Sequence, residues 1–204
     1  MLLERAGAAT LAESRTGDEV VRIAAQLNQR LATPAKSRHL PRLSDRVEEW
    51  ERDLRQGATD LVLAEPGVVR AALATVRELG NDQPELMVHG DLHPRNILAA
   101  EREPRLVVDP KGYVGDPAYD GGNLLKSHLF ALREEDDLDK AVLRTVDVFA
   151  EAAGLAYERV RRWAQFHAVD AAFWGRRHGF RRARTGAELD DLTRLADHLA
   201  RVLM

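Results

Sequence analysis

The sequence contains no cysteine, which excludes a disulfide framework and any chemistry that needs a thiolate. It also lacks any run close to the roughly 20 consecutive apolar residues that span a bilayer. The first residues include acidic side chains and no basic segment before a short apolar stretch, so they do not have the order of a signal peptide. We therefore expect a cytoplasmic protein without a membrane partner.

A strong excess of charge is absent as well. The 30 Lys and Arg residues against 33 Asp and Glu residues give a formal net charge of −3, so we expect no nucleic-acid partner. One local basic cluster exists, and pairing of helix C-terminal charges with nearby acids explains it more simply than DNA binding does. The cluster consists of Arg176, Arg177, Arg181, Arg182 and Arg184.

Most of the sequence has the apolar periodicity of amphipathic helices. Capping boxes, a proline and glycines mark several expected helix ends: Thr16 with Glu19, Ser44, Gly57, Pro66, Gly80, and Thr185 with Glu188. In the second half of the chain, helices are expected near residues 118–132, 136–153, 157–179 and 185–203.

The pattern changes at three short apolar runs, which cover residues 86–88, 97–99 and 106–108. They are too short for helices and are bounded by polar or proline-containing turns, so we expect small strands that frame two loops. Because the strands are few and local, the predicted fold class is α+β, mainly helical. Residues 1–204 are expected to form a single lobe and not a doubly wound sheet.

The two loops framed by these runs, one with Asp91 and one that begins at Asp109, carry the chemistry. Residues 87–96 read MVHGDLHPRN, with Asn96 five residues after Asp91, and Asp109 follows thirteen residues after Asn96. Phosphoryl transfer needs a carboxylate near the attacking hydroxyl and oxygen ligands that hold Mg²⁺ on the phosphates. Asp91 is placed to be that carboxylate, and Asn96 and Asp109 could supply metal ligands. Oxygen ligands alone favour Mg²⁺ over Zn²⁺.

The stretch from His89 to Asn96 resembles the catalytic loop of the aminoglycoside phosphotransferase family, a branch of the protein-kinase-like fold. The stretch DPKGYVGDPAYD, residues 109–120, is most similar to the streptomycin 6-kinase and hydroxyurea phosphotransferase subgroup. The resemblance is strong over roughly residues 85–125. It implies the C-terminal lobe of a kinase-like fold, with Asp91 as catalytic base and with Asn96 and Asp109 as Mg²⁺ ligands. It also implies an ATP-dependent transferase that phosphorylates a hydroxyl of an aminoglycoside-like small molecule and could confer antibiotic resistance.

The chain departs from protein kinases in both loops. Gly90 stands where they have an arginine, and His93 stands where they have a lysine two residues after the catalytic aspartate, so His93 is a second catalytic candidate. Pro110 and Lys111 replace the Phe-Gly pair that follows the metal aspartate. These departures favour a small-molecule kinase.

The opening residues 2–6, LLERA, are similar to the hinge segment of the same subgroup. The resemblance implies that Glu4 and Ala6 lie near the adenine of ATP, although an ordinary helix or strand start remains an alternative. Before Asp91 the sequence offers helices and one lysine, Lys36, outside any β-like run. We therefore expect residues 1–204 to start at the hinge, without the lobe that covers ATP, and to be inactive or weak alone.

Aminoglycosides are polycations, so acidic residues are expected at the acceptor site. Glu134 and Glu135 are candidates, although a charge run at a helix start is usually solvated. Asp116 either touches substrate or structures its loop through Asx-type hydrogen bonds.

Further side chains have simpler structural interpretations. His89 is expected to be a hydrogen-bond hub, and Asp120 to cap or anchor the next helix. Several aromatic side chains at helical spacing favour core packing over a sugar-stacking platform, namely Trp50, Trp163, Phe166, Phe173 and Trp174.

Two other functions stay open on the sequence alone. One is a pseudokinase or fragment that binds a metabolite without catalysis. The other is a kinase for a different small alcohol, such as a sugar, choline or homoserine. A homodimer is also left open.

Overall fold

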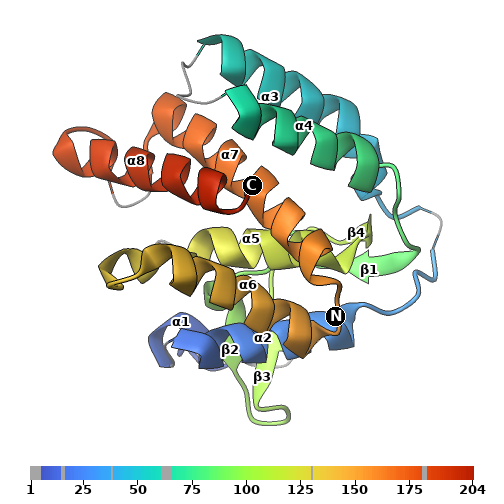
Figure 1. Ribbon diagram of the computed structural model, residues 1–204. Helices are drawn as coiled ribbons and strands as arrows, with labels where there is room; N and C mark the ends of the chain where they lie inside the picture. The colour runs from blue at the N-terminus through green and yellow to red at the C-terminus, as the bar shows by residue number, and fades with distance from the viewer. Residues whose placement is uncertain (1–5, 15–16, 38, 61–65, 130, 181–182) are drawn as a thin grey trace.

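The computed structural model describes residues 6–204 apart from 15–16, 38, 61–65, 130 and 181–182, and helices dominate it (Figure 1). The α-helices are α1 (Leu11–Ser14), α2 (Gly17–Leu31), α3 (Val47–Asp60), α4 (Pro66–Leu79), α5 (Pro117–Leu129), α6 (Leu138–Ala153), α7 (Tyr157–His178) and α8 (Ala187–Val202). Short 3-10 turns are η1 (Leu43–Arg46), η2 (Pro94–Asn96) and η3 (Leu132–Glu134). The strands are β1 (Leu86–Val88), β2 (Ile97–Ala99), β3 (Arg105–Val107) and β4 (Tyr113–Gly115).

The long helix α7 is the centre of the packing. It contacts α3, α4, α5, α6 and α8, and in Figure 1 the α3–α4 pair lies above it while α5 and α6 lie below. Its side chains Trp163 and Phe166 are buried with Phe149 of α6 and Leu124 of α5 in one continuous apolar core. The mainly helical fold class expected from the periodicity is therefore confirmed.

The strands form two separate two-stranded ribbons instead of one sheet. β1 pairs antiparallel with β4, Met87 opposite Val114, and β2 pairs antiparallel with β3, Leu98 opposite Leu106. Each ribbon begins or ends at one of the two predicted loops. β4 was not expected from the sequence, because its three residues lie within a glycine-containing loop that lacks a clear apolar run.

Several expected helix ends are wrong. Ser44 does not cap α3, because it lies inside η1, where the Asp45 carboxylate accepts a hydrogen bond from the Arg42 N–H. Gly57 does not end α3, since the helix continues to Asp60 and the Phe173 ring packs on the glycine. Thr185 is not the cap of α8, because Gly186 occupies that position with φ +79°. The capping position Thr16 lies outside the described residues.

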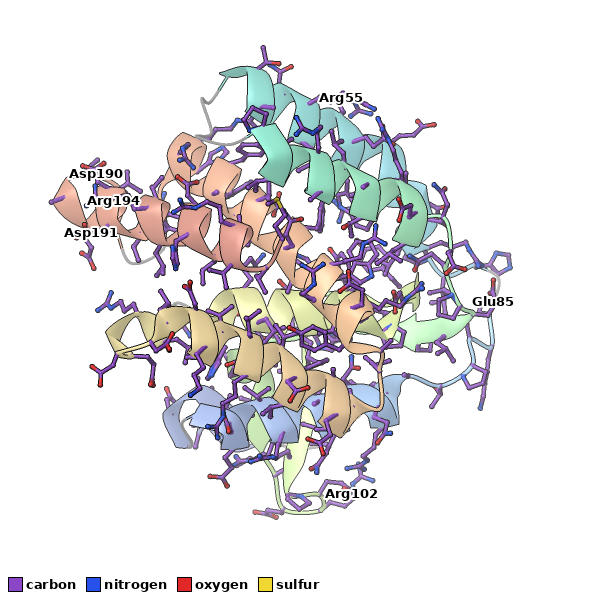
Figure 2. The ribbon with its side chains drawn as sticks, viewed as in Figure 1. Arg55, Glu85, Arg102, Asp190, Asp191 and Arg194 are labelled. Carbon is purple, nitrogen blue, oxygen red and sulfur yellow. The ribbon has the colours of Figure 1, made fainter. Side chains whose placement is uncertain are left out.

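Several ion pairs lie on the outer surface, and Figure 2 labels three of the residues involved, Arg55, Asp191 and Arg194. Arg55 pairs with Glu51 along α3, and Arg194 pairs with Asp191 along α8. Arg176, from the basic cluster, pairs with Asp197, as the simpler interpretation predicted. Well-exposed pairs such as Arg194–Asp191 contribute little to stability. In the described part of the chain, none of the helices is both long and apolar enough to cross a membrane.

Candidate active site

The catalytic loop follows β1, and the side chain of its first residue, His89, forms hydrogen bonds that fix its conformation. The His89 Nδ1 atom accepts a hydrogen bond from the Asp91 N–H at 3.2 Å, so Nε2 carries the proton and donates to the Val108 carbonyl at 3.0 Å. Burial lowers the pKa of His89, although the Val108 hydrogen bond and the Asp91 carboxylate oppose the shift. These contacts match the predicted hub, which joins the catalytic loop to the end of β3.

Asp120 of α5 holds the same loop from the other side. Its two carboxylate oxygens accept hydrogen bonds from the His89 and Gly90 N–H groups, both at 2.8 Å. Burial raises the pKa of Asp120 to about 7, although these N–H donors favour the ionised form. Asp120 thus anchors α5 to the catalytic loop, which is the second of the two roles expected for it, cap or anchor of the next helix.

Gly90 has a backbone reason to replace the arginine of protein kinases. Its φ is +81°, a conformation that L side chains rarely adopt. A Cβ here would lie 2.5 Å from the Tyr113 ring of β4. The glycine therefore allows β4 to pack directly under the loop that presents Asp91.

The Asp91 side chain is partly exposed and has three polar neighbours. Its Oδ1 atom accepts a hydrogen bond from Asn123 Nδ2 of α5 at 3.2 Å. His93 Nε2 lies 3.9 Å from the same oxygen, and Lys111 Nζ lies 4.0 Å from Oδ2. Burial lowers the pKa of His93, and the Asp91 carboxylate opposes that shift. Asp91 Oδ2 is therefore the oxygen more open to an incoming hydroxyl.

The loop that carries Asp109 is tied to the catalytic loop. The Lys111 and Gly112 N–H groups both donate to the His89 carbonyl, at 2.8 and 3.1 Å. Asp109 itself has φ +58°, unusual for a residue other than glycine, and its side chain is 71% exposed. Lys111 Nζ lies 3.9 Å from Asp109 Oδ2. One ammonium group thus lies between the two carboxylates that the sequence singled out.

Asn96 and Asp109 carry the oxygen atoms that the sequence analysis expects to bind Mg²⁺. Asn96 Nδ2 donates to the Asp91 carbonyl at 3.0 Å, so its amide oxygen is the atom available to a cation. No group of three or more His, Cys, Asp or Glu side chains suited to a metal occurs among the described residues. A site with few protein oxygens suits Mg²⁺, which takes its other ligands from phosphates and water.

The remaining predicted site residues lie in varied places. Asp116 is 2% exposed, and its carboxylate accepts hydrogen bonds from the Ala118 N–H, the Trp163 indole and Arg159. The bond from the Ala118 N–H is the Asx-type alternative. Both oxygens of the Asp116 carboxylate accept hydrogen bonds from other groups of the protein. Glu135 is exposed after η3.

The hinge-like start is described only in part. Glu4 and the Glu134 side chain lie outside what is described. Ala6 is partly buried, and its neighbour Gly7 donates to the Ala99 carbonyl of β2 at 2.7 Å.

Two residues near Asp91 were missed by the sequence analysis. Asn123 lies three residues after Asp120, and this spacing puts both on one face of α5. That spacing was an available signal. Lys111 was noted only as a departure from protein kinases, and its role depends on a turn geometry that no residue pattern shows.

Comparisons with known proteins give matches in sequence and in fold. The family model of aminoglycoside/hydroxyurea antibiotic resistance kinases matches residues 1–179. Streptomycin 6-kinase of Streptomyces glaucescens is 33% identical over 178 residues, which cover 85% of this chain and 57% of that protein. Hydroxyurea phosphotransferase of Kitasatospora aureofaciens is 32% identical over 107 residues, 52% of this chain and 29% of that protein. The chain spans about half the length of the streptomycin 6-kinases it matches.

Solved structures give the fold. The choline kinase LicA of Streptococcus pneumoniae aligns with a TM-score of 0.54 at 13% identity, over 91% of this chain and 63% of that one. A choline kinase of Cryptosporidium parvum aligns with a TM-score of 0.50 at 11% identity, over 98% and 68% of the two chains. At these identities the likeness establishes the fold alone, and it confirms a kinase-like fold matched over about two thirds of the neighbouring chains.

Proposed function

Because the chain belongs to the aminoglycoside/hydroxyurea antibiotic resistance kinase family, we propose that it carries the base and metal loops of an ATP-dependent kinase. The proposed acceptor is a hydroxyl group of a cationic, aminoglycoside-like small molecule. The observation that carries the proposal is the position of Lys111 Nζ, 4.0 Å from the Asp91 carboxylate and 3.9 Å from the Asp109 carboxylate. Two carboxylates and a cation in this arrangement suit a reaction at a phosphate.

Asp91 is proposed to orient the acceptor hydroxyl and to take its proton. Asn123 holds Oδ1, so Oδ2 is the oxygen that would accept the hydroxyl hydrogen bond. As the acceptor oxygen bonds to the γ-phosphorus of ATP, the bond from that phosphorus to the bridging oxygen breaks and ADP leaves. The hydroxyl proton passes to Asp91. A positioned general base of this kind contributes about 10²- to 10⁴-fold to rate.

Mg²⁺ would be held by Asn96 and Asp109, and when bound it would neutralise charge on the phosphate oxygens. Lys111 is proposed to stabilise negative charge on the transferred phosphoryl group from the side of the metal loop. His93, beside Asp91 Oδ1, is proposed to help fix the carboxylate in place.

Product detection tests the proposed function. Streptomycin, hydroxyurea and choline are each incubated with excess protein, ATP and MgCl₂, and phosphorylated products are sought by mass spectrometry and ³¹P NMR. We expect a phosphate ester of streptomycin that is absent when EDTA removes the metal. Phosphorylation of choline without any phosphorylation of streptomycin would contradict the proposed acceptor class, and a product that still forms after EDTA removes the metal would contradict the proposed Mg²⁺ dependence.

A further inference from the structure

The helix α5 presents two polar side chains to the catalytic loop from one face. Asp120 and Asn123 are three residues apart, a spacing that makes side chains neighbours on the surface of a helix. Asp120 holds the backbone of the loop, whereas Asn123 reaches the Asp91 side chain itself, with Nδ2 3.2 Å from Oδ1. An ionised carboxylate only accepts hydrogen bonds, so the amide of Asn123 has to face it with its N–H side. The same helix therefore contacts both the loop and the carboxylate that the loop presents.

Asn123 is the best placed of the three polar neighbours of Asp91 to orient its carboxylate. His93 Nε2 and Lys111 Nζ lie 3.9 and 4.0 Å from the Asp91 oxygens, beyond hydrogen-bond distance. The Lys111 side chain is 51% exposed and that of His93 is 27% exposed, whereas Asn123 is 6% exposed. A length of 3.2 Å is at the long end of the range for an N–H donor, and catalytic hydrogen bonds often shorten when substrate binds.

The packing of α5 fixes the position of Asn123. Leu124 and Leu125, which follow it, are fully buried, and Gly122, which precedes it, lets the backbone of α7 approach closely. The Ser127 hydroxyl donates to the Asn123 carbonyl at 3.0 Å, so this bond stays within the helix. A functional group has to be held within about 0.5 Å and 10–20° of its productive geometry, and regular elements achieve this better than loops do. Asn123 thus links a loop carboxylate to a rigid element.

The Asp91 carboxylate needs such a link. Its side chain is 32% exposed, and the terminal torsion of an aspartate has a broad, roughly two-fold distribution. The backbone of the catalytic loop therefore sets where the carboxylate lies but not which way its oxygens point. A base that is misplaced by about 1 Å can lose about 10²-fold in rate.

We propose that Asn123 is a positioning residue for phosphoryl transfer. Its hydrogen bond to Oδ1 sets the rotation of the Asp91 carboxylate, so that Oδ2 meets the acceptor hydroxyl. Asn123 does not touch the acceptor and acts through Asp91 alone. This inference rests on the proposed function and adds to it a residue of α5, outside the two loops that carry the sequence motifs.

Single-turnover kinetics compare the wild type with Asn123→Leu, whose side chain has a similar size but no donor. We expect the maximal rate of phosphoryl transfer to streptomycin to fall about 10- to 100-fold. The streptomycin concentration that gives half of this rate should stay unchanged, since Asn123 does not touch the acceptor. A wild-type maximal rate in Asn123→Leu would overturn the proposal.

Two control variants should keep the wild-type rate. Ser127→Ala removes a hydroxyl that is bonded within α5, four residues from Asn123. Asp147→Asn changes an exposed aspartate of α6. Circular dichroism and urea denaturation of each variant check that its fold is retained.

A double-mutant cycle with Asp91→Ala separates positioning from packing. Residues that act as a unit have non-additive effects, so Asn123→Leu should change the residual rate of Asp91→Ala by about 2-fold or less. A packing defect in α5 would instead lower the rate by the same factor with and without the Asp91 carboxylate. Equal factors in the two backgrounds would therefore overturn the positioning role.

Crystal structures of the wild type and Asn123→Leu test the geometry without requiring turnover. We expect one orientation of the Asp91 carboxylate in the wild type, and a rotated carboxylate or more than one orientation in Asn123→Leu. The same single orientation in both proteins would overturn the role of Asn123, whichever acceptor is phosphorylated. A reoriented carboxylate in Asn123→Leu, together with phosphorylation of choline and not of streptomycin, would overturn the proposed acceptor class and support the positioning role.

Discussion

The residues of the catalytic centre are held mainly by backbone contacts. The His89 and Asp120 side chains hold the loop that presents Asp91 through hydrogen bonds to backbone groups. The N–H groups of Lys111 and Gly112 both donate to the His89 carbonyl and so hold the metal loop against the catalytic loop. The side chains that would meet substrate, Asp91 and Asp109, remain accessible. This division of roles means that substitutions of the functional side chains should change rate without unfolding the protein.

Lys111→Met tests the role given to the ammonium group. Removing one donor that stabilises charge in the transition state costs about 10²- to 10³-fold in rate. We expect a loss of this size in phosphoryl transfer to streptomycin, partly restored in Lys111→Arg, which keeps the charge. Lys140→Met, an exposed lysine of α6, serves as the control. A wild-type rate in Lys111→Met would show that the ammonium only fills space between the carboxylates.

Asp120 gives a stability effect that depends on pH. Its pKa in the folded protein is about 7, above the ordinary value of 3.8, so between about pH 4 and pH 7 the folded protein keeps a proton that the unfolded chain releases. Its contribution to the free energy of unfolding therefore falls as pH rises through this window and is constant above it. In urea denaturation, the free energy of unfolding of the wild type should fall relative to that of Asp120→Asn as pH rises from 4 to 7. A difference that rises or stays constant would contradict this assignment.

The sequence allowed the carboxylates and the amide to be predicted, but not all of their neighbours. The sequence could predict Asp91, Asn96 and Asp109, because phosphoryl transfer requires these residue types in a fixed order and spacing along short loops. Asn123 and Lys111 reach Asp91 only after α5 and β4 have folded against the loop, so their proximity depends on tertiary packing. For Asp116 the sequence left two alternatives open, and the structure shows the Asx-type hydrogen bond from the Ala118 N–H together with bonds from Arg159 and Trp163 that no residue pattern indicates.

At the scale of elements, the packing of α5 against α6 and α7 depends on a glycine pair. Gly121 packs against the Phe149 ring, and a Cβ at Gly122 would lie 2.8 Å from the Trp163 carbonyl oxygen. The periodicity predicted both helices, yet a Gly-Gly pair in a sequence usually indicates a turn. The close approach of the α7 backbone explains why the pair lies within a helix.

Gly122→Ala should therefore destabilise the protein, although alanine favours helix formation. Overpacking against a backbone atom costs about 1–3 kcal/mol. Alanine gains about 1 kcal/mol in helix propensity over glycine, so the overpacking cost equals or exceeds this gain. Gly67→Ala in α4 is the matched control, because its Cβ would meet no atom closer than 3.7 Å. In urea denaturation we expect Gly67→Ala to be as stable as the wild type or more so. Greater stability of Gly122→Ala than of Gly67→Ala would contradict the packing argument.

At the scale of the whole molecule, helices from both halves of the chain meet around the catalytic loops. The resemblance in residues 85–125 predicted the kinase-like fold, and the structural neighbours confirm it. Not all of α7 was predictable in the same way. Trp174 was expected in the core, but it is 60% exposed and its ring lies against that of His178.

The central claim is that Asp91 serves phosphoryl transfer to a cationic small alcohol. The most direct measurement is the single-turnover rate of phosphoryl transfer from ATP to streptomycin for the wild type, Asp91→Asn and the control Asp147→Asn. The account predicts a loss of about 10²- to 10⁴-fold in Asp91→Asn alone, with streptomycin affinity largely retained. Equal rates in the wild type and Asp91→Asn would contradict the account.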